Sequence, residues 1–356
     1  MNEITKLLKI QHPIVQAPMA GGITTSKLVA AVSNNGALGM IGAGYLTPAQ
    51  LQEQIREVKK LTSANFGVNL FVPNYFEINE SQIEKTNQLL SKYKVELNIQ
   101  EENTPLTSIE STKHTFMEQI QIIMEEKVPI CTFTFGVPSK EVLDQLSKRN
   151  IISIGTATTV KEALIIERLG MNAIVVQGSE AGGHRGNFLS THEEGLIGLM
   201  SLTPQVVDHV KIPVIAAGGI MDGRGLMASL SLGASAVQMG TAFLTCEESG
   251  AHPVHKEAII NSKDEDTTLT SAFSGKWARG IKNRFILEMQ EYESTIPNFP
   301  VQNTLTQSIR KASSAGNNKE FMSLWAGQSP LLARNETAGA LIKRIIEEAR
   351  SINTSI

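Results

Sequence analysis

The fold of this chain is decided by a pattern that is clearest in residues 173–186, where AIVVQ is followed by GSEAGGHRG. A short and continuously apolar run is typical of a strand that is covered on both faces. The segment after it can form a loop, because glycines reach positive φ angles and let the backbone come close to a ligand. Its single histidine, His184, can move a proton near neutral pH. The loop is therefore either a ligand site or a glycine-rich turn whose histidine only binds a backbone carbonyl.

The same strand-like run occurs eight times along the chain, and most of the runs precede a segment with helical spacing. Helices are expected at 160–169, at 223–232 and, close to the C-terminus, near 336–351. Eight such units predict an α/β fold, a (β/α)8 TIM barrel. An open, doubly wound sheet remains the alternative, because periodicity does not reveal whether a sheet closes. The eight expected strands are 14–17, 38–41, 66–71, 130–133, 151–154, 173–176, 213–217 and 236–239.

Two intervals are too long to be plain connections between these units. Residues 73–112 are rich in Asn, Glu, Gln, Lys and Ser, and residues 246–330 hold several helical patches. Long insertions after barrel strands usually build a lid, so we expect a smaller, mainly helical accessory region that covers the substrate. The barrel then comprises residues 1–72 and 113–245 together with the C-terminal helix. For 73–112, a mobile polar excursion is the alternative.

The composition favours a small-molecule ligand. The 356 residues carry 32 basic and 35 acidic side chains, a net charge of -3, which gives no field that would attract nucleic acid or an anionic membrane. Two cysteines lie far apart, and no signal-like or membrane-spanning segment is recognised, so we expect a cytoplasmic protein. No zinc-type spacing occurs among the histidines and cysteines, so no metal site is expected. The sequence leaves the oligomeric state open.

The ends of the expected strands are small or contain glycine, which leaves room for a flat ligand across the barrel mouth. The seventh and eighth ends, Gly218-Gly219 and Gly240-Thr241, add backbone N–H groups where barrels of this type bind phosphate, and segment 222–225 adds a helix N-terminus. Taken separately, these glycines could serve only the close packing of strand against helix. Their occurrence at both positions favours a phosphate site.

Two amide side chains, Asn69 and Gln177, stand at strand ends. An amide both donates and accepts, which suits the edge of a flavin ring, where donor and acceptor atoms alternate. The alternative is that each amide binds loop backbone. The sequence contains no P-loop, no nucleophile elbow and no dinucleotide fingerprint in its usual place, which disfavours a classical Rossmann site.

In these residues, the chain resembles the nitronate monooxygenase family, formerly called the 2-nitropropane dioxygenases. The resemblance implies non-covalently bound FMN at the barrel mouth, with a nitronate and O2 as reactants. It further implies that alkyl nitronates such as propionate 3-nitronate, and in some members neutral nitroalkanes, are oxidised to a carbonyl compound and nitrite, a detoxification reaction. The matching segments are PIVQAPMAGG at 13–22, GVNLF at 67–71, FTFGVP at 133–138, QGSEAGGHRG at 177–186, IPVIAAGGI at 212–220, QMGTAFL at 238–244, SAFSGKWARGIKNRF at 271–285 and LWAGQS at 324–329.

The resemblance also implies roles for particular residues. His184 matches the family's catalytic histidine, which binds the nitro group or nitronate and, with neutral nitroalkanes, removes the α-proton as a general base. The residues expected to bind FMN are Met19, Asn69, Gln177, Gly182, Gly218, Gly219, Gln238, Met239, Gly240 and Thr241.

One departure from the family pattern concerns the substrate. Where a late Tyr-Pro pair is expected, this chain has Asn298-Phe299-Pro300, so a hydroxyl near the substrate is missing and the substrate range is open. Arg279 could contact an anionic group or form a structural ion pair.

Two competing functions remain. One is an FMN- and NAD(P)H-dependent enoyl-acyl carrier protein reductase, which shares the Glu-Ala-Gly-Gly-His loop. The other is a flavin-binding barrel without turnover. The first strand, the segment at 133–136 and the segment at 271–285 resemble the monooxygenases and favour that function over the reductase.

Overall fold

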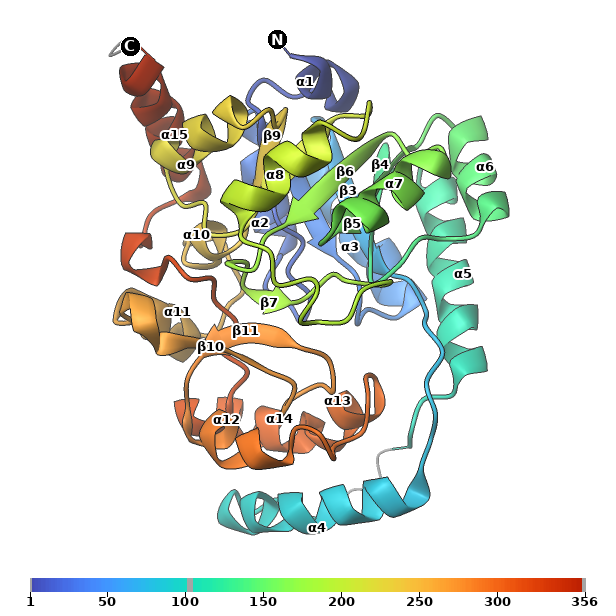
Figure 1. Cartoon of the computed structure of the whole chain (residues 1–356), viewed down its shortest axis with the longest axis vertical. Helices are drawn as coiled ribbons and strands as arrows, with labels where there is room; N and C mark the ends of the chain where they lie inside the picture. The colour runs from blue at the N-terminus through green and yellow to red at the C-terminus, as the bar shows by residue number, and fades with distance from the viewer. Residues whose placement is uncertain (1, 101–104, 354–356) are drawn as a thin grey trace.

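The computed structural model describes residues 2–100 and 105–353, and its centre is a closed barrel of parallel strands (Figure 1). The strands follow one another in the order β1-β9-β8-β6-β5-β4-β3-β2. The ring closes where the Gln16 N–H donates to the Leu38 carbonyl over 2.9 Å and the Leu38 N–H donates to the Ile14 carbonyl over 2.9 Å. The predicted TIM barrel is confirmed, and the open sheet is wrong. The strands are β1 (Ile14–Gln16), β2 (Gly39–Gly42), β3 (Phe66–Phe71), β4 (Ile130–Thr134), β5 (Ile152–Ala157), β6 (Ala173–Gln177), β8 (Val214–Ala217) and β9 (Ala236–Met239).

Amphipathic helices surround the barrel, and most of them begin at a residue whose side chain caps the first turn. Thr47, for example, accepts from the Gln50 N–H, and Pro48 then begins the helix. None of the described helices combines the length and apolar character needed to span a bilayer. The barrel helices are α2 (Ser26–Asn34), α3 (Pro48–Leu61), α5 (Ile109–Glu125), α6 (Lys140–Lys148), α7 (Val160–Arg168), α8 (Leu199–Val207), α9 (Gly223–Ser231) and α15 (Ala338–Asn353).

The core has two layers because alternate strand residues face opposite sides of the sheet. The outer layer lies between strands and helices, and the C-terminal helix α15 joins it where it packs on α9 and α2. The inner layer fills the barrel and is closed at one end by Ile4 and Leu8 of α1 (Glu3–Leu8). In Figure 1, α1 lies at the top, at the end of the barrel opposite the orange helices near the bottom of the view. The other end of the barrel is therefore the one available for a site.

The chain between β9 and α15 forms a layer over that end, which we call the cap (residues 246–330; Figure 1). Its sheet has the antiparallel order β10-β11-β7, with β10 (Thr267–Thr270) and β11 (Ala278–Ile281) from the cap. The third strand, β7 (Gly183–His184), comes from the loop after β6, so that loop ties barrel to cap. The short helix α10 (Thr241–Leu244) precedes the cap. The helices of the cap are α11 (Pro253–Ile260), α12 (Arg284–Met289), α13 (Val301–Leu305) and α14 (Gln307–Ala315), with 3-10 helices at Asp264–Asp266, Gln290–Tyr292 and Lys319–Phe321 and another at its end, Pro330–Leu332.

The helix α4 (Glu80–Glu96), which follows β3, packs on the cap (Figure 1). The ring of Tyr93 lies 5.0 Å from that of Phe285, and its hydroxyl donates to Glu288 over 2.9 Å. The next barrel helix, α5, begins at Ile109, earlier than the expected end of the insertion at 112. The two insertions therefore meet each other on the same side of the barrel.

Candidate active site

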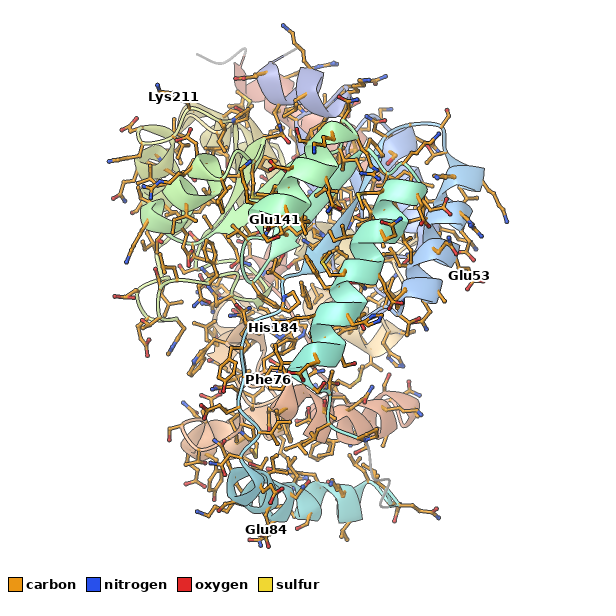
Figure 2. All side chains as sticks on the ribbon, turned by 90° about the vertical axis from the view of Figure 1, so that its right-hand side faces the viewer. Glu53, Phe76, Glu84, Glu141, His184 and Lys211 are labelled. Atoms are coloured by element: carbon orange, nitrogen blue, oxygen red, sulfur yellow. The ribbon has the colours of Figure 1, made fainter. Side chains whose placement is uncertain are left out.

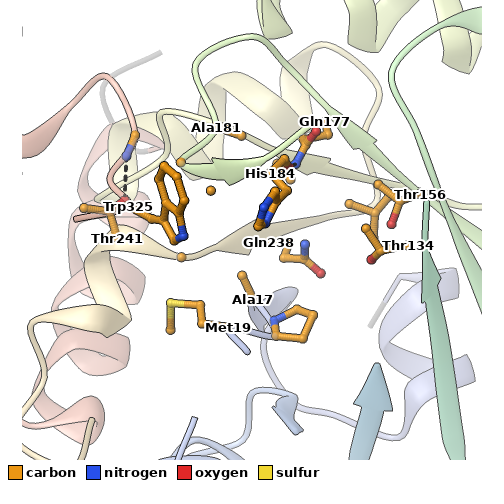
Figure 3. Close-up of a pocket in the computed structure, with 18 of the residues that line it drawn as sticks. Ala17, Met19, Thr134, Thr156, Gln177, Ala181, His184, Gln238, Thr241 and Trp325 are labelled. Atoms are coloured by element: carbon orange, nitrogen blue, oxygen red, sulfur yellow. Dashed lines mark hydrogen bonds between the residues drawn. The ribbon is translucent and has the colours of Figure 1, made fainter. Parts of the chain in front are cut away.

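A deep cavity lies where the C-terminal ends of the barrel strands face the cap. The empty space within it, open solvent at its mouth included, is about 1200 Å³. Figure 2 shows His184 at the level between barrel and cap, and Figure 3 shows the side chains around it. The wall includes, among the residues expected from the sequence, Met19, Asn69, Gln177, Gly182, His184, Gly218, Gly219, Gln238, Gly240 and Thr241.

Met239 was expected at the cofactor site, but its side chain lies outside the cavity. Successive side chains of a strand point to opposite faces, and Gln238 faces the cavity. Met239 therefore points outward, where it is 1% exposed and packs with Val237 in the outer core. Its carbonyl accepts from the Ala17 N–H over 2.8 Å. The residue thus supports the junction of β1 and β9, and its side chain does not line the cavity.

The ends of β8 and β9 carry unpaired backbone donors. Within the described part of the chain, no hydrogen bond uses the N–H groups of Gly219, Gly240 or Thr241. Gly219 has a φ of +66°, a conformation that favours glycine. The hydroxyl of Thr241 is engaged elsewhere, since it accepts from the Gly327 N–H over 2.9 Å, drawn as a dashed line in Figure 3. Free amides at the ends of two neighbouring strands are suited to an anion such as phosphate.

The N-terminus of α9, which was expected to add to a phosphate site, is already occupied. The Asp222 carboxylate accepts from the N–H groups of Arg224 and Gly225 over 3.0 and 3.3 Å. The Gly223 N–H donates to Glu348 of α15 over 2.8 Å. Two carboxylates at one helix end would repel a phosphate, so this expectation was wrong. The amides at the strand ends remain available.

The two amide side chains predicted at the site connect its walls. Gln177 donates from Nε2 to the His184 carbonyl over 3.0 Å and accepts at Oε1 from the Gly186 N–H over 2.8 Å. Asn69 donates to the Thr134 hydroxyl on the neighbouring strand over 3.0 Å. Gln177 therefore binds loop backbone, which was the alternative interpretation of this residue. Its amide fixes the strand that carries His184.

His184 stands in a polar and aromatic setting at the cavity wall. Its Nε2 lies 2.8 Å from the Ser274 hydroxyl. The Phe135 ring meets the imidazole edge-on with 5.7 Å between centroids, and Trp325 lies 5.5 Å away. Figure 3 shows Trp325 and His184 facing the same space. The ring is thus restrained by a hydrogen bond at one nitrogen and by packing on its faces.

Two cations of the cap give the surroundings of this histidine a positive charge. Lys276 donates to the Asn187 carbonyl over 3.2 Å, and Arg310 donates to the Asn303 carbonyl over 2.7 Å, while its buried Nε has no partner among the described residues. Burial lowers the pKa of Lys276 to about 8. Burial, followed by the charges of Lys276 and Arg310, lowers the pKa of His184 to about 3. The imidazole is therefore neutral at physiological pH.

Comparisons with known proteins agree with this geometry. The sequence profile of the family described as nitronate monooxygenase matches residues 2–348. The chain is also 52% identical over 357 residues to a probable nitronate monooxygenase of Staphylococcus haemolyticus, which covers 100% of this chain and 99% of that protein. This chain belongs to the nitronate monooxygenase family.

Two solved structures share the fold of this nitronate monooxygenase family member. A nitroalkane oxidase from Streptomyces ansochromogenes matches with a TM-score of 0.92 at 37% identity and covers 99% of both chains. FabK from Thermotoga maritima matches with a TM-score of 0.78 at 30% identity and covers 100% of this chain and 98% of its own. The chain is an oxidoreductase of the nitronate monooxygenase type. Family membership supports a flavin as its cofactor, with a small molecule and O2 as reactants.

Several residues at the site of this monooxygenase were not singled out from the sequence. Ser274 and Lys276 lie in the matched segment 271–285 without having been given a role. Gly275 between them has a φ of +76°, so a glycine inside that segment was a signal of a constrained turn. Arg310 gave no signal, because an arginine on a helix face is usually solvated.

Arg279 and Arg185 stabilise the loop beside His184. Arg279 is 7% exposed, and its Nε donates to the Ser179 carbonyl over 3.0 Å. Arg185 is 1% exposed and donates to the carbonyl of Gly178 over 2.6 Å. Arg279 therefore forms no ion pair within the described structure. Both guanidinium groups are engaged by loop carbonyls.

Proposed function

We propose that this chain oxidises alkyl nitronates, propionate 3-nitronate among them, with O2 to a carbonyl compound and nitrite, and so removes toxic nitro compounds. The observation that carries the proposal is the position of His184 on the cavity wall, near two cations, Lys276 and Arg310, that form no salt bridge within the described residues. An anionic substrate is favoured at such a place, because partly dehydrated charges without a counter-charge are costly until they are neutralised.

We further infer that the flavin is FMN, bound without a covalent link. The free N–H groups of Gly219, Gly240 and Thr241 would hold its phosphate, and the blocked N-terminus of α9 leaves no comparable place for a second phosphate. When bound, the flavin supplies the redox chemistry, taking electrons from the nitronate and returning them to O2. The other residues proposed to contact it are Met19, Asn69, Gln177, Gly182, Gly218 and Gln238.

The charge around His184 favours nitronates over neutral nitroalkanes. A general base works best when its pKa lies near the working pH, whereas the pKa of His184 is lowered to about 3. A nitronate has already lost its α-proton and needs no base. We infer that His184 binds the nitronate, and that it removes the α-proton of a neutral nitroalkane only slowly.

The cap and α4 are proposed to limit water at the reacting carbon. Phe299 of the cap lies 5.7 Å from Phe135 and 6.2 Å from His184, measured between ring centroids. Phe71 of β3 extends the same group of rings, with its centroid 4.4 Å from that of Phe135. An apolar border of this kind excludes water and strengthens the electrostatic interactions inside it.

The decisive experiment mixes the purified, flavin-loaded protein anaerobically with a nitronate or with NADH in a stopped-flow instrument. The flavin absorbance should bleach with the nitronate, and in air the nitronate should drive O2 consumption without NADH. Rapid bleaching by NADH and none by the nitronate would show an enoyl-acyl carrier protein reductase instead. Bound flavin that neither reagent reduces would show a flavin-binding barrel without turnover.

A further inference from the structure

We propose that Ser274 fixes His184 in the tautomer that carries its proton on Nε2, so that Nδ1 is the atom through which His184 exchanges a proton with the substrate. This inference rests on the proposed function, because it names the atom by which the proposed catalytic histidine acts. Ser274 itself is a positioning residue, since its hydroxyl bonds to the imidazole and to its own turn.

The hydroxyl of Ser274 has three polar neighbours but only one proton. The Lys276 carbonyl, 3.0 Å away, can only accept, and the Lys276 N–H, 3.3 Å away, can only donate. The third neighbour is His184 Nε2 at 2.8 Å. When the hydroxyl proton goes to the carbonyl, the proton in the third contact must come from Nε2.

The opposite tautomer leaves a carbonyl without its partner. If Ser274 donated to His184 Nε2, the Lys276 carbonyl would lose its one hydrogen bond within the described residues and would face the lone pairs of the hydroxyl oxygen. Water cannot easily replace that bond at Ser274, which is 2% exposed. A lost hydrogen bond of this kind makes the second tautomer less populated by roughly tenfold.

The turn that carries Ser274 is held in place. Gly275 has a φ of +76°, and a Cβ there would lie 2.2 Å from the Pro297 carbonyl oxygen, so the backbone is packed directly against the next segment. The Gly275 N–H donates to the Ser271 carbonyl over 2.7 Å, and its own carbonyl accepts from the Phe299 N–H over 3.3 Å. The Ser274 hydroxyl therefore keeps its position, and it determines which nitrogen of the imidazole carries the proton.

The second ring nitrogen of His184 is left accessible. With the His184 backbone fixed by Gln177 and by β11, Nε2 reaches Ser274, while Nδ1 makes no hydrogen bond within the described residues. Nδ1 is not one of the fully buried polar atoms that lack a partner within the described residues, so it retains some exposed surface. Since His184 lines the cavity, this nitrogen offers a free lone pair, the form required to accept a substrate proton.

The first test observes the ring nitrogens directly in the full-length, flavin-loaded protein labelled with 15N-histidine. Two-bond 1H–15N spectra distinguish a protonated from an unprotonated ring nitrogen, and His184→Asn identifies the signals of His184. At neutral pH we expect a proton on Nε2 and none on Nδ1. A ring protonated on Nδ1, or two tautomers in similar amounts, would overturn the proposal without any need for a variant of Ser274.

The second test compares Ser274→Ala with Ser313→Ala, a matched control. Ser313 is another buried serine of the cap whose hydroxyl donates to a carbonyl, that of Asn318. Ser274→Ala should show both tautomers and should lower kcat for a neutral nitroalkane about five- to tenfold, the size of one net hydrogen bond, with little change in KM. Turnover of a preformed nitronate should change less, because no α-proton has to be removed.

The outcomes of the second test separate this inference from the function on which it rests. Ser274→Thr, which keeps a hydroxyl, should restore the wild-type tautomer and kcat, and Ser313→Ala should keep both. An unchanged tautomer in Ser274→Ala would overturn the role of Ser274. A wild-type protein with the expected tautomer but without nitronate turnover would refute the proposed function and leave the assignment of the proton intact.

Discussion

The two walls of the cavity differ in what they present to a ligand. The barrel wall consists of strand ends and the loop at 178–184, and it offers backbone N–H groups and small side chains. On the cap side, Trp325 lines the cavity, and behind the lining His184 is surrounded by a hydroxyl, an ammonium, a guanidinium and an aromatic ring, from Ser274, Lys276, Arg310 and Phe299. The hydrogen bonds between the barrel strands fix the backbone positions of the barrel wall, whereas cap side chains can be substituted without breaking those bonds. We therefore expect the barrel wall to retain the cofactor and the cap wall to select and position the substrate.

The largest effect is expected at His184, which belongs to both walls because β7 pairs with β11. His184→Asn should lower turnover of neutral nitroalkanes by about 10²-fold, the lower end of the usual contribution of a general base, because the lowered pKa of His184 makes it a weak base. Flavin content, read from the visible absorbance of the purified variant, should stay at the wild-type level, since none of the proposed phosphate donors changes. Undiminished turnover of a neutral nitroalkane would remove His184 from the role of base.

A change in the barrel wall should act on the cofactor instead. Gly219→Ala places a Cβ 3.3 Å from that of Glu180 at a φ of +66°, beside the proposed phosphate donors, and should weaken flavin binding about tenfold or more. Gly170→Ala is the matched control, because its φ is +83° and its Cβ would meet open space. Both variants should lose about 1–2 kcal/mol of stability through the left-handed backbone. Equal flavin affinity in the two variants, measured by fluorescence titration, would place the phosphate elsewhere.

The barrel wall could be predicted from the sequence because its signals are local. Continuous apolar runs indicated the strands, and their glycine-bearing ends indicated where the backbone is free to meet a ligand. Gln238 and Met239 show the limit of this reasoning. A motif covers both residues, but the strand alternation sends one into the cavity and the other into the outer core.

The cap wall could not be predicted in the same way, because its residues come together only through tertiary packing. Ser274 reaches His184 across 90 positions of the chain. Arg310 lies on α14, where nothing in the neighbouring sequence distinguishes it from a solvated arginine. The same holds for the N-terminus of α9, whose glycines suggested a phosphate site. One of the two carboxylates that occupy it, that of Glu348, comes from 125 residues further along the chain.

The charge of the cap wall can be tested through pH. Burial lowers the pKa of Lys276 from 10.5 to about 8, so its ammonium is present below that pH and is lost as the pH rises through it. KM for a nitronate should therefore rise between about pH 7 and pH 9 in the wild type. Lys276→Met should already have a KM raised about five- to tenfold near pH 7, without this rise.

O2 uptake over that pH range provides the measurement for Lys276. Lys282→Met serves as the control, because Lys282 is an exposed lysine of the cap that binds the Glu265 carbonyl. Its KM should follow the wild-type curve. If Lys276→Met kept the wild-type pH dependence, the positive charge that attracts the substrate would have to come from Arg310 alone.

The smallest effect is expected from adding the missing hydroxyl to the cap wall. In Phe299→Tyr the new group would extend a ring that lies 6.2 Å from the His184 ring and 6.5 Å from Phe71, between centroids. Tyr45, whose ring lies 5.5 Å from Phe71, already lines the cavity. If charge selects the substrate, one more hydroxyl should change KM for nitronates only about two- to threefold. This is less than the change that one full hydrogen bond would cause. A change beyond about tenfold, or a new order of preference among nitronates, would mean that the cap wall selects by hydrogen bonding at position 299 rather than by the field of its two cations.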